Sequence, residues 1–527
     1  MTLGRFLRTT VVALAIAGTA CSSRTPEGSA GTGGSGPGGS TGGGGKAGSG
    51  GMLVSGGTTG SGGQKDPGGS TATGGRGGWD ATGGATSSGG QKGPGGSSGL
   101  DGGSGPGAGG AGTTGDAGIY VGTKTPGTAQ TGDITITPAT TYQTMDGFGI
   151  ADVWETKQGS TPALLTLLFD PDQGIGLTLL RIGIESNGKI MGDAAFVDGP
   201  EVVKHGGKVW AAPWSPPASS KDNNNVNNGG HLSTGAYDSW SSTLAAFPAY
   251  FKQQSGVDLW GISAQNEPDF VANYESCIFD KTQMNNFIKV LGPKLQALTP
   301  PVHVIAAEPD TWGNTWGGDN FGTAINADST VSSLVDIIAM HDYDNRTNNS
   351  TTRPSPPATN THHIWETEIY YSDGADIGPG LETARGIYAG VTTGGASGWH
   401  YWWTRAFMNG GDASKPPKRV YTMGNFSKFV RPGYVRVGIT GAPASVQIVP
   451  FVNPTDGTVA IVALNSGSSD VAVSFFVAGA GWPSTVTPYV TSASSNLKPG
   501  TALPSVTGGR FSGSLAAQSV TTFVGKP

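Results

Sequence analysis

Cysteine is nearly missing from this chain, whose 527 residues include only Cys21 and Cys277. Because Cys21 lies close to the N-terminus, the folded part has no second cysteine for an intrachain disulfide. Cys277 is then either a small buried hydrophobic residue or a reactive thiol. Charged residues are also few, at 13%, with a formal net charge of −6. This balance argues against a nucleic-acid partner and suits a neutral, hydroxyl-rich substrate that the 13 tryptophans could contact.

The apolar run near the N-terminus, from Val11 to Ala17, is too short to span a membrane. With Arg5 and Arg8 before it and small residues before Cys21, it gives residues 1–21 the pattern of a secretory signal peptide. Two outcomes stay open: Cys21 is lipidated after cleavage and anchors the protein to a membrane, or the protein is simply secreted. Either way, the sequence predicts an extracellular or cell-surface location.

Large apolar residues are scarce from residue 22 to residue 132, where Gly, Ser, Thr and Pro dominate. Such a segment cannot bury enough apolar surface to offset the entropy that is lost on ordering. We therefore predict a disordered, flexible tether over residues 22–132, which acts as a spacer. The roughly 395 residues that remain fit a large barrel plus a smaller domain.

Between residues 147 and 429, short apolar runs alternate with helical patterns, which indicates parallel strands that are covered by helices. Eight strand candidates in about 280 residues predict an α/β fold, a (β/α)8 TIM barrel, as the catalytic domain. The candidates are Gly147–Gly149, Leu179–Ile182, Lys208–Ala212, Leu259–Ile262, Val302–Ala306, Ile337–Met340, His363–Trp365 and Gly398–Trp402.

After residue 430 the pattern changes to short β runs between Gly, Pro, Ser and Asn turns, which predicts an antiparallel β-sandwich. Ile134–Ile136, just before the barrel, is expected to add a strand to it. The side domain would then comprise residues 133–146 plus 430–527 and be tightly associated with the barrel. Its other predicted strands are Val435–Val437, Val446–Val449, Val459–Val462, Val471–Phe475 and Ser519–Val524.

Two of the predicted barrel strands end in a glutamate, Glu267 after the fourth strand and Glu368 after the seventh. The C-terminal strand ends of such a barrel share one rim, and strands four and seven lie on opposite sides of it. Paired carboxylates across a sugar are typical of glycosidases and stand about 5–5.5 Å apart in the retaining type. We predict Glu267 as the acid/base, because burial and the charge of Glu368 raise its pKa, and Glu368 as the nucleophile.

Glu366 competes with Glu368 for the role of nucleophile. Alternation along a strand puts both side chains on the same face, so parity does not separate them. The residue nearer the strand end is favoured, and our prediction is therefore Glu368.

Other side chains at the strand ends are candidates for substrate binding. Asn266 is expected to hydrogen-bond the sugar 2-hydroxyl. Arg181 either holds the nucleophile ionised or forms a salt bridge within the barrel. His341 is expected to orient the nucleophile together with Tyr343, with a purely structural histidine as the alternative. Aromatic rings at strand ends either stack on pyranose rings or pack in the core, and these are Trp214, Tyr343, Tyr370 and Trp402.

The sequence offers no pattern for a cofactor. No group of His, Asp and Glu has the spacing of a metal site, and no Gly-rich loop follows a strand and opens a helix as a phosphate site requires. We therefore predict neither a metal nor another cofactor. A monomer is the default expectation for an enzyme that works on an insoluble polymer.

Several motifs along residues 133–527 resemble glycoside hydrolase family 30, a group with a barrel and a β-sandwich. They are Met145–Gly149, Leu180–Gly183, Ala212–Pro217, Gln265–Pro268, Trp365–Glu368, Tyr401–Trp403 and, most specific, Met423–Arg436, which is similar to the bacterial xylanase branch. The resemblance implies a retaining hydrolase with Glu267 as acid/base and Glu368 as nucleophile. It also implies β-1,4-xylan, a xylan-type polysaccharide, as the substrate.

The chain departs from that branch where its glucuronoxylanases bind a glucuronate side group. The family has Trp-Trp-Tyr-Ile-Arg-Arg after the eighth strand, whereas this chain has Trp402–Phe407, in which Arg405 is the only arginine and is offset. Beyond the nucleophile, the family's Asp-Ser is reversed to Ser372-Asp373, which places a carboxylate where an anionic group would bind. Since like charges at contact lower affinity, we expect glucuronate dependence to be weakened or absent.

Two other functions are weighed beside an exported endo-β-1,4-xylanase. The same fold could act on another β-glycan, either a β-1,6-glucan or a β-glucoside. A protein of a different class, a surface carbohydrate-binding protein with an inactive barrel, is disfavoured because both glutamates are present.

Overall fold

The structure, a computed structural model, describes residues 120–347, 350–505 and 508–527. The predicted signal peptide and residues 22–119 of the predicted tether lie outside the described residues. Among the helices of the described part, none combines the length and the apolar character that a membrane crossing needs.

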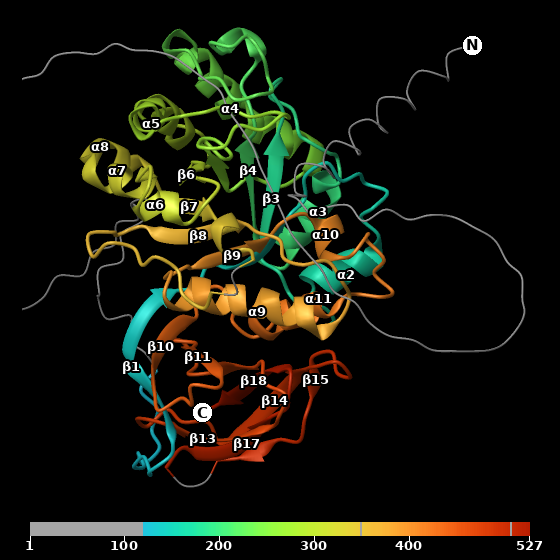
Figure 1. The fold of residues 1–527 in the computed structure, drawn as a ribbon, viewed down its shortest axis with the longest axis vertical. Helices are drawn as coiled ribbons and strands as arrows, with labels where there is room; N and C mark the ends of the chain where they lie inside the picture. The colour runs from blue at the N-terminus through green and yellow to red at the C-terminus, as the bar shows by residue number, and fades with distance from the viewer. Residues whose placement is uncertain (1–119, 348–349, 506–507) are drawn as a thin grey trace, which may run out of the picture. The chain divides into compact units, whose positions relative to one another are not determined.

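Eight parallel strands close into a barrel, which confirms the predicted (β/α)8 fold (Figure 1). Nearly every residue of these strands is buried, because neighbouring strands and the surrounding helices cover both faces of the sheet. The strands are β2 (Gly147–Ala151), β3 (Leu179–Ile184), β4 (Lys208–Pro213), β5 (Gly261–Ser263), β6 (His303–Ala307), β7 (Ile337–His341), β8 (His363–Glu368) and β9 (Gly398–Tyr401).

The helices of the barrel form where capping and apolar spacing agree. In α5 (Lys281–Gln296), the side chain of Asp280 accepts a hydrogen bond from the backbone N–H of Gln283 at 2.8 Å, which caps the first turn. Residues spaced three or four apart, such as Met284, Phe287 and Leu291, form its buried face. The other α-helices are α2 (Pro162–Phe169), α3 (Ala195–Lys204), α4 (Tyr237–Ser255), α6 (Gly313–Trp316), α7 (Phe321–Ala327), α8 (Ser329–Leu334), α9 (Ile377–Thr392), α10 (Thr404–Phe407) and α11 (Lys418–Ser427). Short 3-10 helices span Ala218–Ser220, Thr234–Ala236 and Tyr343–Asn345.

The second body is a sheet with the strand order β15-β14-β18-β12-β11-β10-β1-β13-β17, and β16 pairs with β14. Strand β1, which precedes the barrel in the sequence, pairs antiparallel with β10 and parallel with β13. One neighbour pair of this otherwise antiparallel sheet is thus parallel. The strands are β1 (Ile134–Thr144), β10 (Val435–Thr440), β11 (Gln447–Val452), β12 (Val459–Asn465), β13 (Val471–Val477), β14 (Thr485–Thr491), β15 (Lys498–Pro499), β16 (Leu503–Pro504), β17 (Arg510–Leu515) and β18 (Ser519–Lys526).

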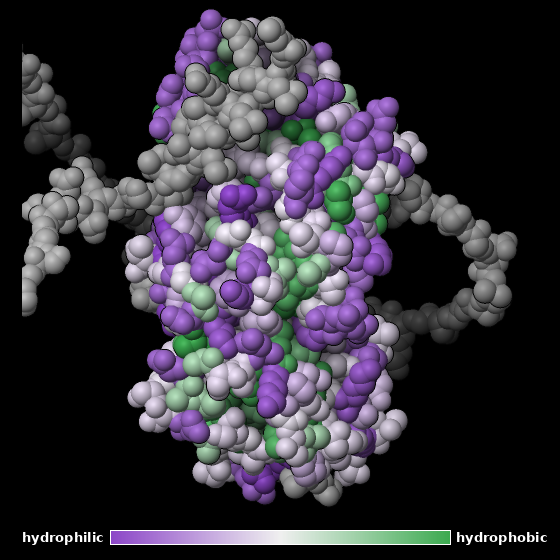
Figure 2. All heavy atoms as spheres, turned by 90° about the vertical axis from the view of Figure 1, so that its right-hand side faces the viewer, coloured by the Kyte–Doolittle hydropathy of each residue, from purple (hydrophilic) through white to green (hydrophobic). Residues whose placement is uncertain are grey.

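The sheet folds over on itself, so that strands far apart in its order share one core. Phe475 of β13 lies 5.2 Å from Phe523 of β18, measured between ring centroids, and 5.0 Å from Phe511 of β17. This is the packing of a β-sandwich, as the sequence predicted. On the face drawn in Figure 2, hydrophilic residues cover most of the surface, and hydrophobic ones show in small areas between them.

Helix α11 lies between the barrel strands and the sandwich (Figure 1), and buried hydrogen bonds join it to the sandwich. The amide of Asn425 donates to the carbonyl oxygen of Tyr489 at 3.0 Å and to the hydroxyl of Thr522 at 3.0 Å. The Thr522 hydroxyl in turn donates to the carbonyl oxygen of Asn425 at 2.6 Å. These polar groups are satisfied only when both bodies are in place, which fixes the sandwich to the barrel.

The described residues 120–132, which belong to the predicted tether, contact the sandwich. Lys124 Nζ donates to the hydroxyl of Ser484 at 2.6 Å and lies 4.5 Å from the ring centroid of Trp482. The indole N–H of Trp482 donates to the carbonyl oxygen of Thr125 at 3.2 Å.

Candidate active site

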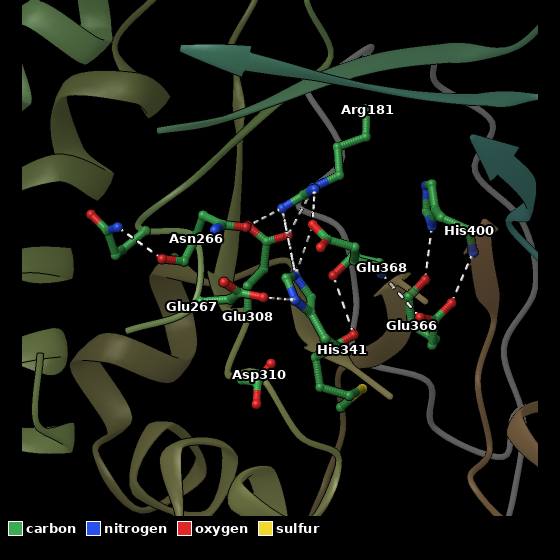
Figure 3. Close-up of polar contacts among 12 residues, drawn as sticks. Arg181, Asn266, Glu267, Glu308, Asp310, His341, Glu366, Glu368 and His400 are labelled. Carbon is green, nitrogen blue, oxygen red and sulfur yellow. Dashed lines mark hydrogen bonds and ion pairs between the residues drawn. The ribbon is translucent and has the colours of Figure 1, made fainter. Parts of the chain in front are cut away.

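Glu267 and Glu368 converge at the C-terminal rim of the barrel, where β5 and β8 end (Figure 3). One carboxyl oxygen of Glu267, one of Glu368 and a ring nitrogen of His341 all lie within 4.8 Å of one another. Both glutamates are at least 94% buried, with exposed fractions of 6% and 5%. This separation suits a retaining glycosidase, which needs about 5–5.5 Å, and is too small for the inverting type.

The backbone at this rim is strained in a way that typically marks a functional site. Among the residues other than glycine with positive φ angles are Trp154 at 61°, Glu267 at 46°, Glu308 at 59° and Trp403 at 52°. Such conformations cost free energy and persist where the surroundings enforce them. For Glu267, one such constraint is the hydrogen bond from its backbone N–H to the carbonyl oxygen of Glu308, at 3.0 Å.

Arg181 organises the polar groups of the site from the middle of β3, not from the strand end that the sequence predicted (Figure 3). Its fully buried guanidinium donates to Glu368 Oε2 at 2.6 Å, to Glu308 Oε1 at 3.2 Å and to Asn266 Oδ1 at 2.5 Å. Arg181 thus forms buried salt bridges, one of the two alternatives from the sequence, and one of them is to the predicted nucleophile. The contact with Asn266 fixes the orientation of that amide.

Burial and charge set the protonation of the two carboxyls that flank His341. Burial raises the pKa of Glu267, the negative charge of Glu368 adds to this, and the hydrogen bond from His341 opposes it. For Glu308, burial also acts upward, but Arg181 and His341 outweigh it and lower the pKa to about 2. Glu267 thus favours its protonated form, whereas Glu308 is a permanent anion.

His341 lies on β7 between three carboxylates. Burial disfavours its cationic form, but the charge of Glu368 and hydrogen bonds to Glu267 and Glu308 outweigh burial and raise its pKa well above the usual value. Its Nδ1 donates to Glu267 Oε1 at 3.2 Å. The sequence assigned His341 to orienting the nucleophile, whereas its ring hydrogen bond goes to the predicted acid/base.

Glu366 lies deeper in the barrel than Glu368 and is fully buried. Its carboxyl oxygens accept the backbone N–H groups of Glu368 and His400, each at 3.0 Å. Burial, with the charge of Asp342 added, raises the pKa of Glu366 well above its usual value. Glu366 thus supports the backbone beneath Glu368 and does not reach the mouth of the site. This difference distinguishes the two glutamates, which strand alternation alone places on the same face.

His400 is neutral and fixed in one tautomer. Burial lowers its pKa to about 3. Its Nε2 accepts the indole N–H of Trp210 at 3.1 Å, so the proton resides on Nδ1, which donates to the carbonyl oxygen of Glu366 at 2.8 Å.

The predicted aromatic residues fall into two groups. Tyr343 donates its hydroxyl to Glu368 Oε1 at 2.8 Å, and its ring lies edge-on to Tyr370 at 6.3 Å. One face of Tyr370 is covered by the guanidinium of Arg346, at 3.6 Å from the ring centroid. Tyr343 therefore contacts the predicted nucleophile directly, and Tyr370 packs behind it.

Trp214 and Trp402 form the second group and are almost fully buried, with exposed fractions of 2% and 9%. The ring of Trp154 lies 6.1 Å from Trp214 and 5.9 Å from Trp402, and it is 40% exposed. Trp154 is thus the member of the cluster that presents most surface to a ligand, and the sequence analysis missed it. Its position just after β2 is the signal that could have identified it.

Arg405 lies at the rim but not among the polar groups of the centre. Its Nε is 3.5 Å from Glu155 Oε1, and its guanidinium carbon is 5.8 Å from the ring centroid of Trp403. Its side chain is 46% exposed.

Two further acidic residues that the sequence analysis did not single out lie after β6. Glu308 follows a buried strand directly, the same signal that identified Glu267, but no recognised motif surrounds it. Asp310 lies next to Glu267 in Figure 3, and burial, reinforced by the charge of Glu267, raises its pKa to about 7. Cys277 is fully buried, and burial raises the pKa of its thiol to about 12, which favours the inert hydrophobic role over a reactive thiol.

Glu267, His341 and Glu368 also have the composition and spacing of a metal site. Two cationic groups disfavour that use, since Arg181 already contacts Glu368 at 2.6 Å and the raised pKa of His341 favours its protonated form. A protonated imidazole has no lone pair for a metal.

The model of the glycosyl hydrolase family 30 TIM-barrel domain matches residues 196–382, and that of the glycosyl hydrolase family 30 beta sandwich domain matches residues 433–523. The glucuronoxylanase XynC of Bacillus subtilis (strain 168) is 30% identical over 403 residues, which cover 74% of this chain and 91% of that protein. The putative glucosylceramidase 4 of Caenorhabditis elegans is 28% identical over 315 residues, covering 51% and 58%. Among solved structures, the family 30 subfamily 8 xylanase Xyn30A from Clostridium acetobutylicum has a TM-score of 0.64 at 31% identity, covering 75% of this chain and 100% of that one.

Proposed function

Because the chain belongs to glycosyl hydrolase family 30, we propose that it is an exported endo-β-1,4-xylanase that retains the anomeric configuration of the cleaved sugar. Membership of the family makes it a glycoside hydrolase. The proposal adds the sugar, the retaining mechanism and the location. The observation that carries the mechanism is the approach of Glu267 and Glu368 to within 4.8 Å at one rim.

In the first step, Glu368 attacks the anomeric carbon while Glu267 donates its proton to the departing oxygen. Hydrogen bonds from Arg181 and Tyr343 to the two oxygens of Glu368 hold the side chain in position for this attack. Burial and the charge of Glu368 keep the proton on Glu267 until the leaving oxygen needs it.

In the second step, Glu267 changes from acid to base because Glu368 has lost its negative charge. Once Glu368 is esterified to the sugar, it no longer repels an ionised Glu267, so the pKa of Glu267 falls. The His341 N–H, at 3.2 Å, then stabilises the Glu267 carboxylate while it removes a proton from the attacking water. Asn266, held by Arg181, is available to hydrogen-bond the sugar 2-hydroxyl, where such contacts strengthen in the transition state.

Two observations support xylan as the substrate class: some relatives are named as xylanases, and the charges at the rim bear on the side groups of the polymer. Arg405, the one arginine within Trp402–Phe407, lies against Glu155 and close to Trp403, so its charge is partly compensated. Asp373, five residues beyond Glu368, adds an exposed carboxylate. An anionic side group on the substrate would meet these acidic residues, which supports a xylanase whose dependence on glucuronate is weakened.

The experiment that tests the sugar compares turnover on glucuronoxylan, unsubstituted linear xylan and a β-1,6-glucan, with product analysis for each. We expect cleavage of both xylans at rates within about tenfold of each other, and little cleavage of the glucan. Near-zero activity on linear xylan would contradict the weakened dependence. Cleavage of the glucan or of a β-glucoside alone would favour the alternative substrate, to which the relative named as a glucosylceramidase points.

A non-catalytic carbohydrate-binding protein is separated from an enzyme by two variants of the same strand. Glu368→Gln should lower kcat by several orders of magnitude and leave xylan binding largely intact. Glu366→Gln, the matched control, removes an equally buried carboxyl that does not face the substrate and should retain measurable turnover. Equal loss in the two variants would reopen the choice of nucleophile.

Export is proposed from the pattern of residues 1–21. Cell fractionation of the full chain and of Cys21→Ser tests it. Wild type in the membrane fraction with the variant in the medium supports a lipid anchor at Cys21, and both in the medium supports plain secretion. Retention of both inside the cell would contradict export.

A further inference from the structure

Two neighbouring apolar residues next to Glu267 are exposed to solvent. Phe270 has an exposed fraction of 38% and Val271 of 63%, and both lie in the loop that leads from β5 to α5. Contiguous exposed apolar residues are typical of contact surfaces.

The loop is held firmly at its start, so the exposure does not come from a loose segment. The backbone N–H of Phe270 donates to the carbonyl oxygen of Glu267 at 3.2 Å. The carboxylate of Asp269 accepts the backbone N–H of Asp310 at 2.8 Å and the side-chain amide of Asn314 at 2.7 Å.

The far end of the loop is tied to other parts of the rim. The backbone N–H of Phe279 donates to the carbonyl oxygen of Pro268 at 2.8 Å, and that of Asn228 donates to the carbonyl oxygen of Ala272 at 2.9 Å. Buried Lys221 reaches the same loop and donates to the carbonyl oxygen of Ser276 at 2.5 Å. Phe270 and Val271 are therefore displayed on a fixed frame beside the acid/base.

We propose that Phe270 and Val271 form a leaving-group platform, a surface that binds the sugar units on the departing side of the cleaved bond through the apolar faces of their rings. This inference rests on the proposed function. An acid/base protonates the departing oxygen, so the departing part of the chain lies on the side of Glu267. Phe270 is three residues away on the same loop, and an aromatic ring suits the C–H face of a pyranose.

The platform lies apart from the tryptophan cluster around the barrel. Trp154 follows β2 and Trp402 follows β9, which are neighbouring strands, whereas Phe270 follows β5, three strands from β2. The catalytic pair comes from β5 and β8. A polysaccharide that crosses this pair can contact the tryptophans with one end and Phe270 with the other, which is the arrangement that cleavage within a chain requires.

The test compares a substrate that has leaving-group sugars with one that lacks them. Xylohexaose places xylose units on the departing side, whereas an aryl β-xylobioside places only a small aromatic group there. In Phe270→Ala, the ratio of kcat/KM for xylohexaose to that for the aryl xylobioside should fall on the order of tenfold. Phe270→Tyr, which keeps an aromatic ring, should restore most of the ratio, and Val271→Ala should lower it by a smaller factor.

A matched control is Val203→Ala, because Val203 is an apolar residue of α3 with a similar exposed fraction of 37%. It should change neither kcat/KM value. The proposal is overturned if Phe270→Ala leaves the ratio unchanged, or if it lowers both values equally, which would make Phe270 a support for Glu267. The proposed function fails separately, if the wild-type protein cleaves neither substrate.

Discussion

Replacing Glu368 with glutamine should lower the pKa of Glu267, because the coupling between these two carboxyls underlies the proposed exchange of roles. Two unit charges no more than 4.8 Å apart repel each other by roughly 3 kcal/mol or more at an effective dielectric constant of about 20. Glutamine keeps the shape of the side chain and removes the charge. The ionised form of Glu267 then no longer meets this repulsion, so it forms at a lower pH than in the wild type.

The response of His341 does not reverse this expectation. The charge of Glu368 is the strongest of those that raise the pKa of His341, so the variant weakens the imidazolium. Glu267 and Glu308 remain beside the ring and still favour its charged form. Arg181, released from Glu368, also continues to stabilise negative charge at the site.

The assay is a pH titration by ¹³C NMR of protein labelled at the glutamate carboxyl carbons, with Glu267 assigned by comparison with Glu267→Gln. The titration does not depend on turnover, so an inactive variant serves as well as the wild type. Glu201→Gln, which removes a carboxylate on α3 that pairs with Lys204, is the control and should leave the Glu267 signal unchanged. An equal or higher pKa for Glu267 in Glu368→Gln would refute the coupling.

Three further predictions address the neighbours of the two glutamates. Tyr343→Phe removes a hydrogen bond to charged Glu368, so kcat/KM should fall on the order of 10- to 100-fold in steady-state assays, with the protein still folded. Asp310, whose pKa the charge of Glu267 helps to raise to about 7, becomes charged near neutral pH; because such coupling is reciprocal, Asp310→Asn should move the alkaline limb of the kcat/KM profile to lower pH. The pKa of Glu308 is about 2 when folded and 4.5 in its usual range, so it contributes stability above pH 4.5 that is lost as the pH falls towards 2. Urea denaturation over this range should show a shallower loss of stability in Glu308→Gln than in the wild type.

Each of these variants has an outcome that would contradict its reasoning. Unchanged kinetics in Tyr343→Phe would mean that the hydroxyl does not support the nucleophile. The exposed carboxylate of Asp373 provides a control for Asp310, and an equal shift in Asp373→Asn would point to overall charge instead of proximity to Glu267. If unfolding of Glu308→Gln has the same pH dependence as that of the wild type, Glu308 does not contribute to the loss of stability at low pH.

The barrel and the catalytic pair could be predicted because their signals are local. Each barrel strand is a short buried run; Glu368 is the last residue of β8 and Glu267 follows the end of β5 by four residues, so the shared rim follows from the fold class. The sequence favoured Glu368 over Glu366 only through its position nearer the strand end, and the contacts that distinguish the two could not be predicted. They depend on a register shift between β7 and β8 after Met340 and on the two backbone N–H groups that Glu366 accepts.

The features that the sequence did not predict depend on contacts between segments that are distant in the chain. The pairing of Arg405 with Glu155 joins loops that are 250 residues apart, and no local pattern encodes it. The prominence of Trp154 depends on how deeply Trp214 and Trp402 are buried behind it. The parallel pairing of β1 with β13 likewise arises from the packing of the sandwich, whereas alternating apolar residues specify only that a strand forms.

The most direct test of the two-carboxylate mechanism is to trap the covalent intermediate and identify the residue that carries it. A 2-deoxy-2-fluoro-β-xylobioside with a reactive leaving group slows the second step more than the first, so the glycosyl-enzyme accumulates and can be mapped by peptide mass spectrometry. We predict a single labelled residue, Glu368, and rapid labelling that requires its carboxylate. A label on Glu366 or Glu308, or inversion of the anomeric configuration with no covalent adduct, would contradict the mechanism.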